Sequence, residues 1–294
     1  MKKTFNILLF LCCVSSLFFV GCHKKETVQV DNETQSAVDN SVADQEYSEL
    51  PSTANDHAIN TKGTGATRDG RIVPPCDSLT KISGDTLFGQ PGHIDPTYTM
   101  NISNVACNTT LPDGRFRTGT LKIRLTGRIR RPGSKMILKM LNYNVIMPMG
   151  TTTANVTYSC DSIVITTLDS SALYTKFNVK LINGVCQWGS GKIIKYSSDR
   201  TITSYPKGNP LNTSPVTEVF GTANGVNRDL KAFTVLIPSS SPIVKHKACR
   251  YIDKGIFELT PEGFKTRTVD FGDGTCDNKA TFNVNGSTVA FTLN

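Results

Sequence analysis

From residue 72 onward the chain consists of short β-type runs separated by turn dipeptides, and this pattern constrains the fold more than any other feature. The runs are rich in β-branched and aromatic residues, and no window sustains a helical apolar stripe for three turns. They cover residues 121–125, 162–166, 177–181, 192–196, 232–237, 255–259, 281–284 and 287–293. Asn-Gly or Asp-Gly pairs, which suit tight hairpin turns, occupy residues 113–114, 183–184, 224–225, 273–274 and 285–286. The sequence therefore predicts an all-β fold built from antiparallel strands.

The N-terminal residues have the layout of an export signal. Lys2 and Lys3 precede an apolar run over residues 7–20, which is shorter than the roughly 20 residues of a membrane-spanning helix. The stretch Phe19-Val20-Gly21-Cys22 resembles the lipobox of bacterial lipoproteins, although Phe19 stands where Leu is usual. We expect residues 1–21 to be a signal peptide and Cys22 to carry lipid that holds the protein at a membrane. The alternative is a secretory peptide cut at a small-x-small site, and no such site is evident near the end of the run.

Residues 23–75 are polar and almost free of aromatic side chains, and no apolar period persists in them. Such a segment buries too little apolar area to offset its ordering entropy, so we expect residues 22–75 to form a lipidated, disordered tether. As a flexible coil it would reach about 40 Å. The segment holds nine acidic and five basic residues, whereas the chain from Ile72 on holds 25 Lys and Arg against 15 Asp and Glu. An acidic tether is thus expected to precede a basic body that covers residues 76–294.

Six cysteines follow Cys22, an even number that favours disulfides over metal ligation in an exported chain without a C-x-x-C pair. The gaps between them are 31, 53, 26, 63 and 27 residues, so short and long gaps alternate. This spacing favours bridges from Cys76 to Cys107, from Cys160 to Cys186 and from Cys249 to Cys276. Similar flanking residues indicate a weak internal repeat with candidate units 76–155, 160–240 and 249–294. The alternative is that some of the six are buried free thiols.

Residues 115–139 contain nine basic residues and no acidic one. Strict alternation over residues 121–130 would place Leu121, Ile123, Leu125 and Ile129 on one face of a strand and Lys122, Arg124, Arg128 and Arg130 on the other. Such a ladder would concentrate anionic lipid headgroups or glycans. Nucleic acid is not expected, because the chain is exported and aromatic residues for base stacking are absent from the ladder. The alternative is the solvated face of a half-buried strand, opposed by acids such as Glu258 and Asp270.

The string Thr-Val-Asp-Phe-Gly-Asp-Gly-Thr-Cys-Asp-Asn at residues 268–278 carries three carboxylates around a turn. Asp270, Asp273 and Asp277 are a weak calcium candidate, because their spacing is not the alternate-residue pattern of an EF-hand loop. The string also resembles the signature of PKD-type extracellular β-sandwiches, but such a domain would need more strands than the remaining residues can supply. We predict a hairpin turn that Asp273 closes and Cys276 staples, and no metal or cofactor.

Several strings together resemble an uncharacterised family of envelope lipoproteins of Bacteroidota. They lie at residues 114–123, 126–128, 221–228, 249–250, 260–263 and 267–280, the last reading Arg-Thr-Val-Asp-Phe-Gly-Asp-Gly-Thr-Cys-Asp-Asn-Lys-Ala. The resemblance covers the body, is most specific in the last 45 residues and is weaker around Cys160 and Cys186. It implies an envelope lipoprotein and no particular activity. The triplets at residues 77–79, 85–87 and 161–163 also match the O-glycosylation pattern of that phylum.

We therefore expect a non-enzymatic structural or binding protein, lipid-anchored in the outer membrane, whose body contacts anionic glycan or lipid. The alternative is a hydrolase that acts on envelope glycans through two carboxylates about 5 to 10 Å apart. For this role the sequence nominates Asp270 and Asp273 alone.

Overall fold

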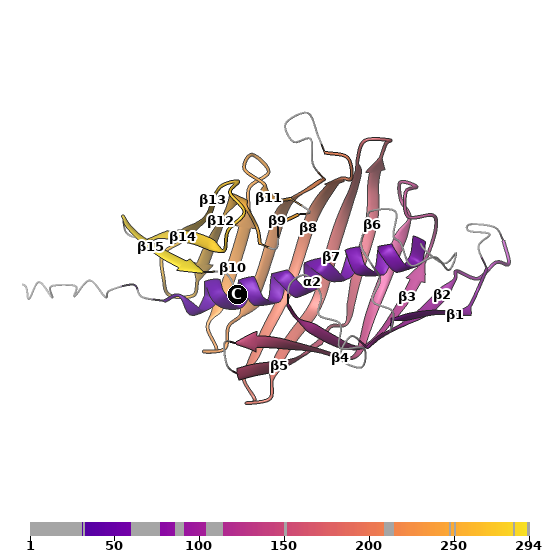
Figure 1. Cartoon of the computed structure of the whole chain (residues 1–294), viewed down its shortest axis with the longest axis horizontal. Helices are drawn as coiled ribbons and strands as arrows, with labels where there is room; N and C mark the ends of the chain where they lie inside the picture. The colour runs from indigo at the N-terminus through magenta and orange to yellow at the C-terminus, as the bar shows by residue number, and fades with distance from the viewer. Residues whose placement is uncertain are drawn as a thin grey trace, which may run out of the picture. The chain divides into compact units, whose positions relative to one another are not determined.

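The structure, a computed structural model, describes residues 31, 33–59, 77–85, 91–103, 114–149, 152–208, 215–246, 248–249, 251–284 and 286–292. Residues 33–294 group into one compact unit, whose described part is an antiparallel sheet with a helix lying across the strands (Figure 1). The elements are α2 (Gln35–Ile59), β1 (Ser78–Ser83), β2 (Thr97–Ser103), β3 (Phe116–Leu125), β4 (Lys135–Met149), β5 (Thr152–Ser159), β6 (Ser162–Ser170), β7 (Thr175–Trp188), β8 (Ile193–Tyr205), β9 (Val216–Val226), β10 (Ala232–Ile237), β11 (Ile243–His246), β12 (Lys254–Pro261), β13 (Arg267–Asp273), β14 (Lys279–Val284) and β15 (Ser287–Thr292).

The described strands form one 15-stranded sheet in which most sequence neighbours are also neighbours in space. Two strands leave the main order. β6 pairs with β4 and β7, and β11 pairs with β9 and β12. The prediction of an all-β antiparallel fold is confirmed, and each of the eight predicted runs coincides with a strand. The predicted units 76–155, 160–240 and 249–294 all contribute strands to this one continuous sheet.

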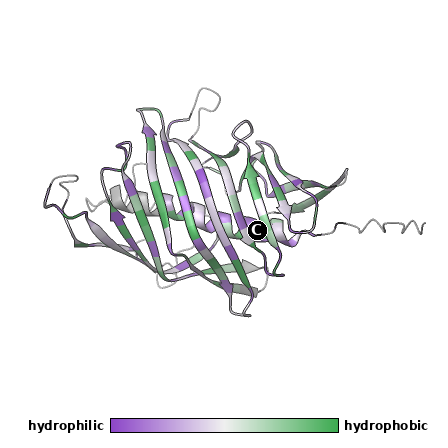
Figure 2. Ribbon diagram, turned by 180° about the vertical axis from the view of Figure 1, so that it is seen from behind, coloured by the Kyte–Doolittle hydropathy of each residue, from purple (hydrophilic) through white to green (hydrophobic). Residues whose placement is uncertain are grey.

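Side chains alternate between a buried and an exposed face along the strands, as the sequence pattern requires. In β3, Leu121, Ile123 and Leu125 are buried, whereas Lys122 and Arg124 between them are exposed. The buried apolar residues of the strands form one cluster that includes Ala43, Tyr47 and Leu50 of α2. Figure 2 shows the sheet from the side away from α2, with hydrophobic and hydrophilic residues mixed along the strands. The core therefore lies between the helix and the sheet.

The prediction of a disordered tether over residues 22–75 is wrong for residues 33–59. The amides of Ala37 and Val38 donate to the carbonyl of Thr34, and the Glu33 carboxylate accepts the amide of Ser36 at 2.8 Å, so the first turn of α2 is capped. The helix continues through Pro51 to Ile59. Tertiary contacts therefore stabilise a helix that local apolar periodicity does not indicate. Cys22, the signal peptide and the remainder of the predicted tether, apart from Asp31, lie outside the described residues.

Two of the predicted turn dipeptides lie inside strands. Residues 183–184 belong to β7, where the pairing with β8 shifts register, and residues 224–225 belong to β9. A Cβ on Gly184 would lie 3.0 Å from the Tyr47 ring, and one on Gly225 would lie 2.5 Å from the Phe233 ring. These glycines therefore leave room for close aromatic neighbours. The predicted turns at Gly274 and Gly286 do lie at strand ends.

The disulfide predictions have three different outcomes. The bridge from Cys249 to Cys276 is confirmed, with 5.6 Å between the two Cα atoms. The bridge from Cys160 to Cys186 is wrong, because both residues are free thiols. Tyr158 is the residue opposite Cys186 in the β5–β7 ladder, so Cys160 is two positions out of register with it. Cys76 and Cys107 lie outside the described residues.

Removing the confirmed bridge should destabilise the body. The double variant Cys249→Ser, Cys276→Ser loses a link that closes a 27-residue separation, and we expect its free energy of unfolding to fall by about 3.5 kcal/mol. Urea denaturation measures the loss. The control Cys160→Ala removes a free thiol and should cost less than about 1.5 kcal/mol. Equal stability of the double variant and the wild type would contradict the bridge.

Candidate functional site: an acidic helix on a basic sheet face

The helix and the sheet face beneath it carry opposite charges. Residues 33–59 contain no Lys or Arg, and five of their carboxylates each pair with a basic residue of the sheet. We call the sheet residues that pair with α2 the helix seat: Arg115, Arg117, Tyr143, Tyr158, Tyr196, Arg200, Arg228, Lys245 and Arg267. These residues lie on or next to strands from β3 to β13, so α2 links distant parts of the sheet (Figure 1).

Glu46 makes the most complete set of contacts with the helix seat. Its carboxylate accepts from Arg117 Nε at 2.8 Å and Nη2 at 2.9 Å, which is a bidentate pair. The Tyr143 hydroxyl donates to it at 2.6 Å, and Arg115 Nη1 lies 3.6 Å away. The Glu46 side chain is fully buried. Burial and the charge of Glu46 raise the pKa of Tyr143 well above its usual value, so the hydroxyl keeps its proton and remains a donor.

Asp39 pairs with Arg228, which follows the fully buried Asn227 in the sequence. The Arg228 Nη2 atom lies 2.7 Å from Asp39 Oδ1, and the Arg228 backbone amide donates to Oδ2 at 2.7 Å. The guanidinium also lies 4.6 Å from the centre of the Trp188 ring, so a cation–π contact supports it from the sheet. Asp39 itself is fully buried.

Glu33 fixes the N-terminal end of α2. Its carboxylate lies 3.3 Å from Arg267 Nη1, and its backbone carbonyl also accepts a hydrogen bond from that atom. The Asn227 amide donates to Ser36 Oγ at 2.9 Å and lies within 3.3 Å of Glu33. The first turn of the helix is therefore tied to the end of β9 and to β13.

The contact at Asp44 is less complete. The Tyr196 hydroxyl donates to Asp44 at 2.7 Å, and Arg200 Nη2 lies 3.5 Å from the same oxygen. The Nε and Nη1 atoms of Arg200 are buried without a hydrogen-bond acceptor among the described residues, as is the Oδ1 atom of Asn40 without a donor. Leaving such groups unpaired carries a free-energy cost.

Tyr47 reaches from α2 to the paired residues of β5 and β7. Its hydroxyl lies 2.7 Å from the carbonyl of Ser159 and 3.0 Å from that of Val185, and its ring stacks on Tyr196 at 6.3 Å. The free thiols of Cys160 and Cys186 lie beside this hydroxyl. Burial raises the pKa of Cys160 to about 12 and that of Cys186 further still, so both remain protonated. They behave as buried small side chains rather than nucleophiles.

The seven other basic residues of segment 115–139 do not belong to the helix seat. We call them the outer basic patch: Lys122, Arg124, Arg128, Arg130, Arg131, Lys135 and Lys139. All seven are exposed, and Lys122 lies directly opposite Lys139 in the β3–β4 ladder. Like charges at directly opposed positions destabilise a sheet. Arg124 pairs with Asp95 at 2.9 Å, the one acidic partner of the patch among the described residues.

Two details of the predicted basic ladder are wrong. Strand β3 ends at Leu125, so Arg128 and Arg130 lie in the β3–β4 connection rather than on the strand. Glu258 and Asp270 belong to β12 and β13, far along the sheet order from β3, and do not oppose the ladder. The reason is that the sheet is a meander, so acids distant in sequence are also distant in the sheet.

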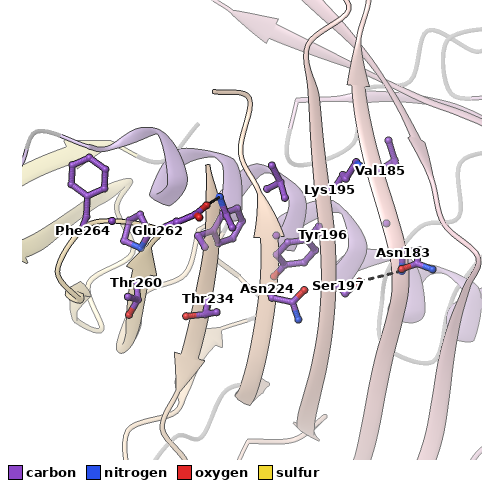
Figure 3. A pocket seen from close by; sticks show the side chains of 17 residues that line it. Asn183, Val185, Lys195, Tyr196, Ser197, Asn224, Thr234, Thr260, Glu262 and Phe264 are labelled. Atoms are coloured by element: carbon purple, nitrogen blue, oxygen red, sulfur yellow. Dashed lines mark hydrogen bonds between the residues drawn. The ribbon is translucent and has the colours of Figure 1, made fainter. Parts of the chain in front are cut away.

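A shallow groove of about 830 Å³ lies over β7, β8, β9, β10 and β12. Figure 3 shows side chains of its lining projecting in a row from adjacent strands: Asn183, Ser197, Asn224, Thr234 and Thr260. The pairing registers place Ser197 opposite Asn224, Asn224 opposite Thr234 and Thr234 opposite Thr260. Ser197 follows the inward-facing Tyr196, so the row faces away from α2. Its amides and hydroxyls can hydrogen-bond to hydroxyl-rich ligands.

The carboxylates of segment 268–278 serve their own turns. Asp270 accepts the amide of Gly272, Asp273 accepts the amide and hydroxyl of Thr275, and Asp277 accepts the amide of Lys279. The hydrogen bonds from Thr275 lower the pKa of Asp273. No group of three His, Cys, Asp or Glu side chains in the described ranges is arranged to hold a metal ion. Within the same residues, no helix is long and apolar enough to cross a membrane.

Sequence reasoning missed the carboxylates of α2 and their partners in the helix seat. A helical repeat was present in the segment, because Asp39, Ala43, Glu46 and Leu50 recur at intervals of three or four residues. All four are buried. Because two of these four residues are acidic and one is alanine, apolar periodicity does not indicate the buried face of the helix.

Neutralising Glu46 should destabilise the body far more than neutralising Glu49. Glu46→Gln leaves Arg117 buried without its counter-charge, and we expect a loss of about 3 to 5 kcal/mol in the free energy of unfolding. The matched control Glu49→Gln removes a partly exposed pair with Lys245 and should cost less than about 1 kcal/mol. Urea denaturation gives both values. Similar losses in the two variants would show that the buried pair does not hold the helix.

Comparison of the chain with protein-family models, with curated proteins and with solved structures finds no match in any of the three. The roles assigned to the helix seat and to the outer basic patch therefore depend on the geometry of this chain alone.

Proposed function

We propose that the chain is a lipid-anchored, non-enzymatic protein of the bacterial outer membrane whose β body binds anionic groups of envelope lipid or glycan through the outer basic patch. Lipid on Cys22 supplies the attachment, and the patch supplies a second contact. A single acyl chain gives only marginal membrane binding, whereas a lipid combined with a basic patch gives stable attachment.

The observation that carries this proposal is the cross-strand pair of Lys122 and Lys139 within the outer basic patch. The sheet tolerates this repulsion although β3 and β4 are otherwise well packed, with Leu121 and Leu138 fully buried behind them. An anionic ligand that lies across both strands would relieve the repulsion.

The division of charge within segment 115–139 supports the same interpretation. Arg115 and Arg117 face inward and are buried in contact with carboxylates of the helix. The other seven basic residues are exposed, and among the described residues Arg124 alone of the seven has an acidic partner. The inward residues stabilise the fold, so the outward ones are available for a ligand.

Reversing charge in the patch should abolish adsorption to anionic vesicles. The variant Lys122→Glu, Arg128→Glu, Arg130→Glu spares the pair of Arg124 with Asp95. Each basic residue near an anionic surface contributes about 1 kcal/mol, so losing three should weaken binding about 100-fold or more. Sedimentation with vesicles of phosphatidylglycerol and phosphatidylcholine at low salt measures it, and an acidic polysaccharide in place of vesicles tests the glycan source.

The matched control makes the same charge change elsewhere on the sheet, with Lys195→Glu, Lys254→Glu and Lys265→Glu. These three residues are exposed and lie outside the patch. If the control loses as much vesicle binding as the patch variant, net charge rather than the patch is responsible. Retained adsorption of the patch variant to both vesicles and polysaccharide would exclude the proposal.

The anchor has its own test. We expect Cys22→Ser to release a folded body, with Cys249 still joined to Cys276, from the membrane fraction of the expressing cells. Cys13→Ser changes a cysteine in the segment predicted to be discarded and should leave the protein membrane-bound. Fractionation followed by immunoblotting measures both, and a Cys22→Ser protein that stays with the membrane would contradict lipid attachment at this residue.

A further inference from the structure

The groove over β7, β8, β9, β10 and β12 crosses five adjacent strands. Figure 3 shows Glu262 and Phe264 at one end of it and Asn183 and Val185 at the other. Each of the five strands contributes one polar side chain to the row that faces away from α2, which we call the polar row: Asn183, Ser197, Asn224, Thr234 and Thr260. Because neighbouring strands lie about 4.8 Å apart, the row is about 19 Å long. This length suits a chain of several sugar units.

Short side chains beside the polar row make room for a ligand. Val226 lies opposite Lys195 in the β8–β9 ladder and opposite Ala232 in the β9–β10 ladder. The Glu262 amide donates to the Ala232 carbonyl at 2.8 Å. Val226 and Ala232 therefore lie between the longer side chains of Lys195 and Glu262. The space of about 830 Å³ has the size of a site for a small molecule.

The polar row keeps hydrogen-bonding capacity for a ligand. Ser197 Oγ accepts the backbone amide of Asn183 at 3.2 Å, so its own proton is left to donate. The Asn183 side-chain amide donates to Asp161 at 2.6 Å, which leaves its carbonyl oxygen as an acceptor. Asn224 and Thr234 make no side-chain hydrogen bond with any residue that the structure describes. A hydroxyl group both donates and accepts, so a sugar hydroxyl can pair with every member of the row.

The charges around the groove favour an uncharged ligand. Lys195 and Glu262 are the two charged residues of its lining, and they carry opposite charges. An anionic group would gain no net attraction from such a pair, in contrast to the field of the outer basic patch. The groove and the patch therefore suit different ligand chemistries.

The strands beneath the groove do not suit a peptide or protein partner. β8, β9 and β10 are each paired on both sides, so they offer no edge to which a peptide strand could add. The core of a protein interface needs apolar or aromatic anchors, and the polar row has none. Phe264 at the end of the groove is half-buried, with the Lys231 ammonium 4.4 Å from its ring centre. The hydroxyl groups of a carbohydrate match what the groove offers.

We propose that this groove binds an uncharged glycan chain, which lies across the strands with its hydroxyls on the polar row. The central strands hold the row in place before a ligand arrives, so binding has a small ordering cost. The site is separate from the outer basic patch and its proposed anionic ligand.

Removing two members of the polar row should weaken binding of neutral glycans. The variant Asn224→Ala, Thr234→Val deletes an amide and a hydroxyl at exposed positions, where substitutions leave a fold intact. Loss of two hydrogen bonds should lower the affinity about 10- to 100-fold. Affinity electrophoresis of the full chain toward the cathode measures it, in native gels that contain dextran, mannan or hydroxyethyl cellulose. A polyoxyethylene detergent keeps a lipid-bearing chain in solution without adding a sugar.

Two controls separate the groove from the rest of the sheet. Asn155→Ala, Thr222→Val makes the same changes at exposed residues outside the groove and should bind as the wild type does. The patch variant Lys122→Glu, Arg128→Glu, Arg130→Glu should also keep its affinity for the neutral polysaccharides, because it leaves the groove unchanged.

Three results would overturn the proposal. The first is a wild-type chain that none of the three polysaccharides retards. The second is a groove variant that is retarded as strongly as the wild type, and the third is an equal loss of affinity in either control. In the last two cases the polysaccharide binds elsewhere on the body.

Discussion

Glu46 is the carboxylate on which the packing of α2 depends, because two nitrogen atoms of Arg117 and the hydroxyl of Tyr143 donate to it away from solvent. This contact sets the position of the helix across the strands. The next residue, Tyr47, contacts the carbonyls of Ser159 in β5 and Val185 in β7, and Gly184 leaves room for its ring. A buried ion pair and an aromatic anchor thus hold adjacent residues of the helix, and Gly184 fits the ring of the anchor.

The strands could be predicted from sequence, and the helix could not. In β3 apolar and polar residues alternate over residues 121–125, so the period of two appears directly in the chain. In α2 the buried face contains Asp39 and Glu46, so its burial has no hydrophobic signature. Their partners come from β3 and from the end of β9, far away in sequence. Only the three-dimensional arrangement shows that these acids are compensated.

The sequence spacing of the cysteines also failed to predict a disulfide where the register of two paired strands keeps the cysteines apart. The sequence separation of Cys160 and Cys186 is compatible with a bridge. The β5–β7 pairing nevertheless places Tyr158, not Cys160, opposite Cys186, and Tyr47 lies beside both cysteines. By contrast, Cys249 and Cys276 follow the ends of β11 and β13 and meet there. In the basic segment 115–139, the alternation of side chains along a strand did indicate which arginines are buried. Arg115 and Arg117 have odd numbers, as do the buried Leu121 and Ile123, so all four are expected on the same face.

The orientation of α2 has a mechanical consequence for any tension applied to the N-terminal part of the chain. A pull from that side enters the described body at Glu33, whose contacts with Arg267 and Asn227 are the first to bear it. The contacts of Asp39, Asp44 and Glu46 follow in sequence order along the helix. The body would therefore yield one ion pair at a time, starting at β13, while the hydrogen-bonded strands beneath remain intact.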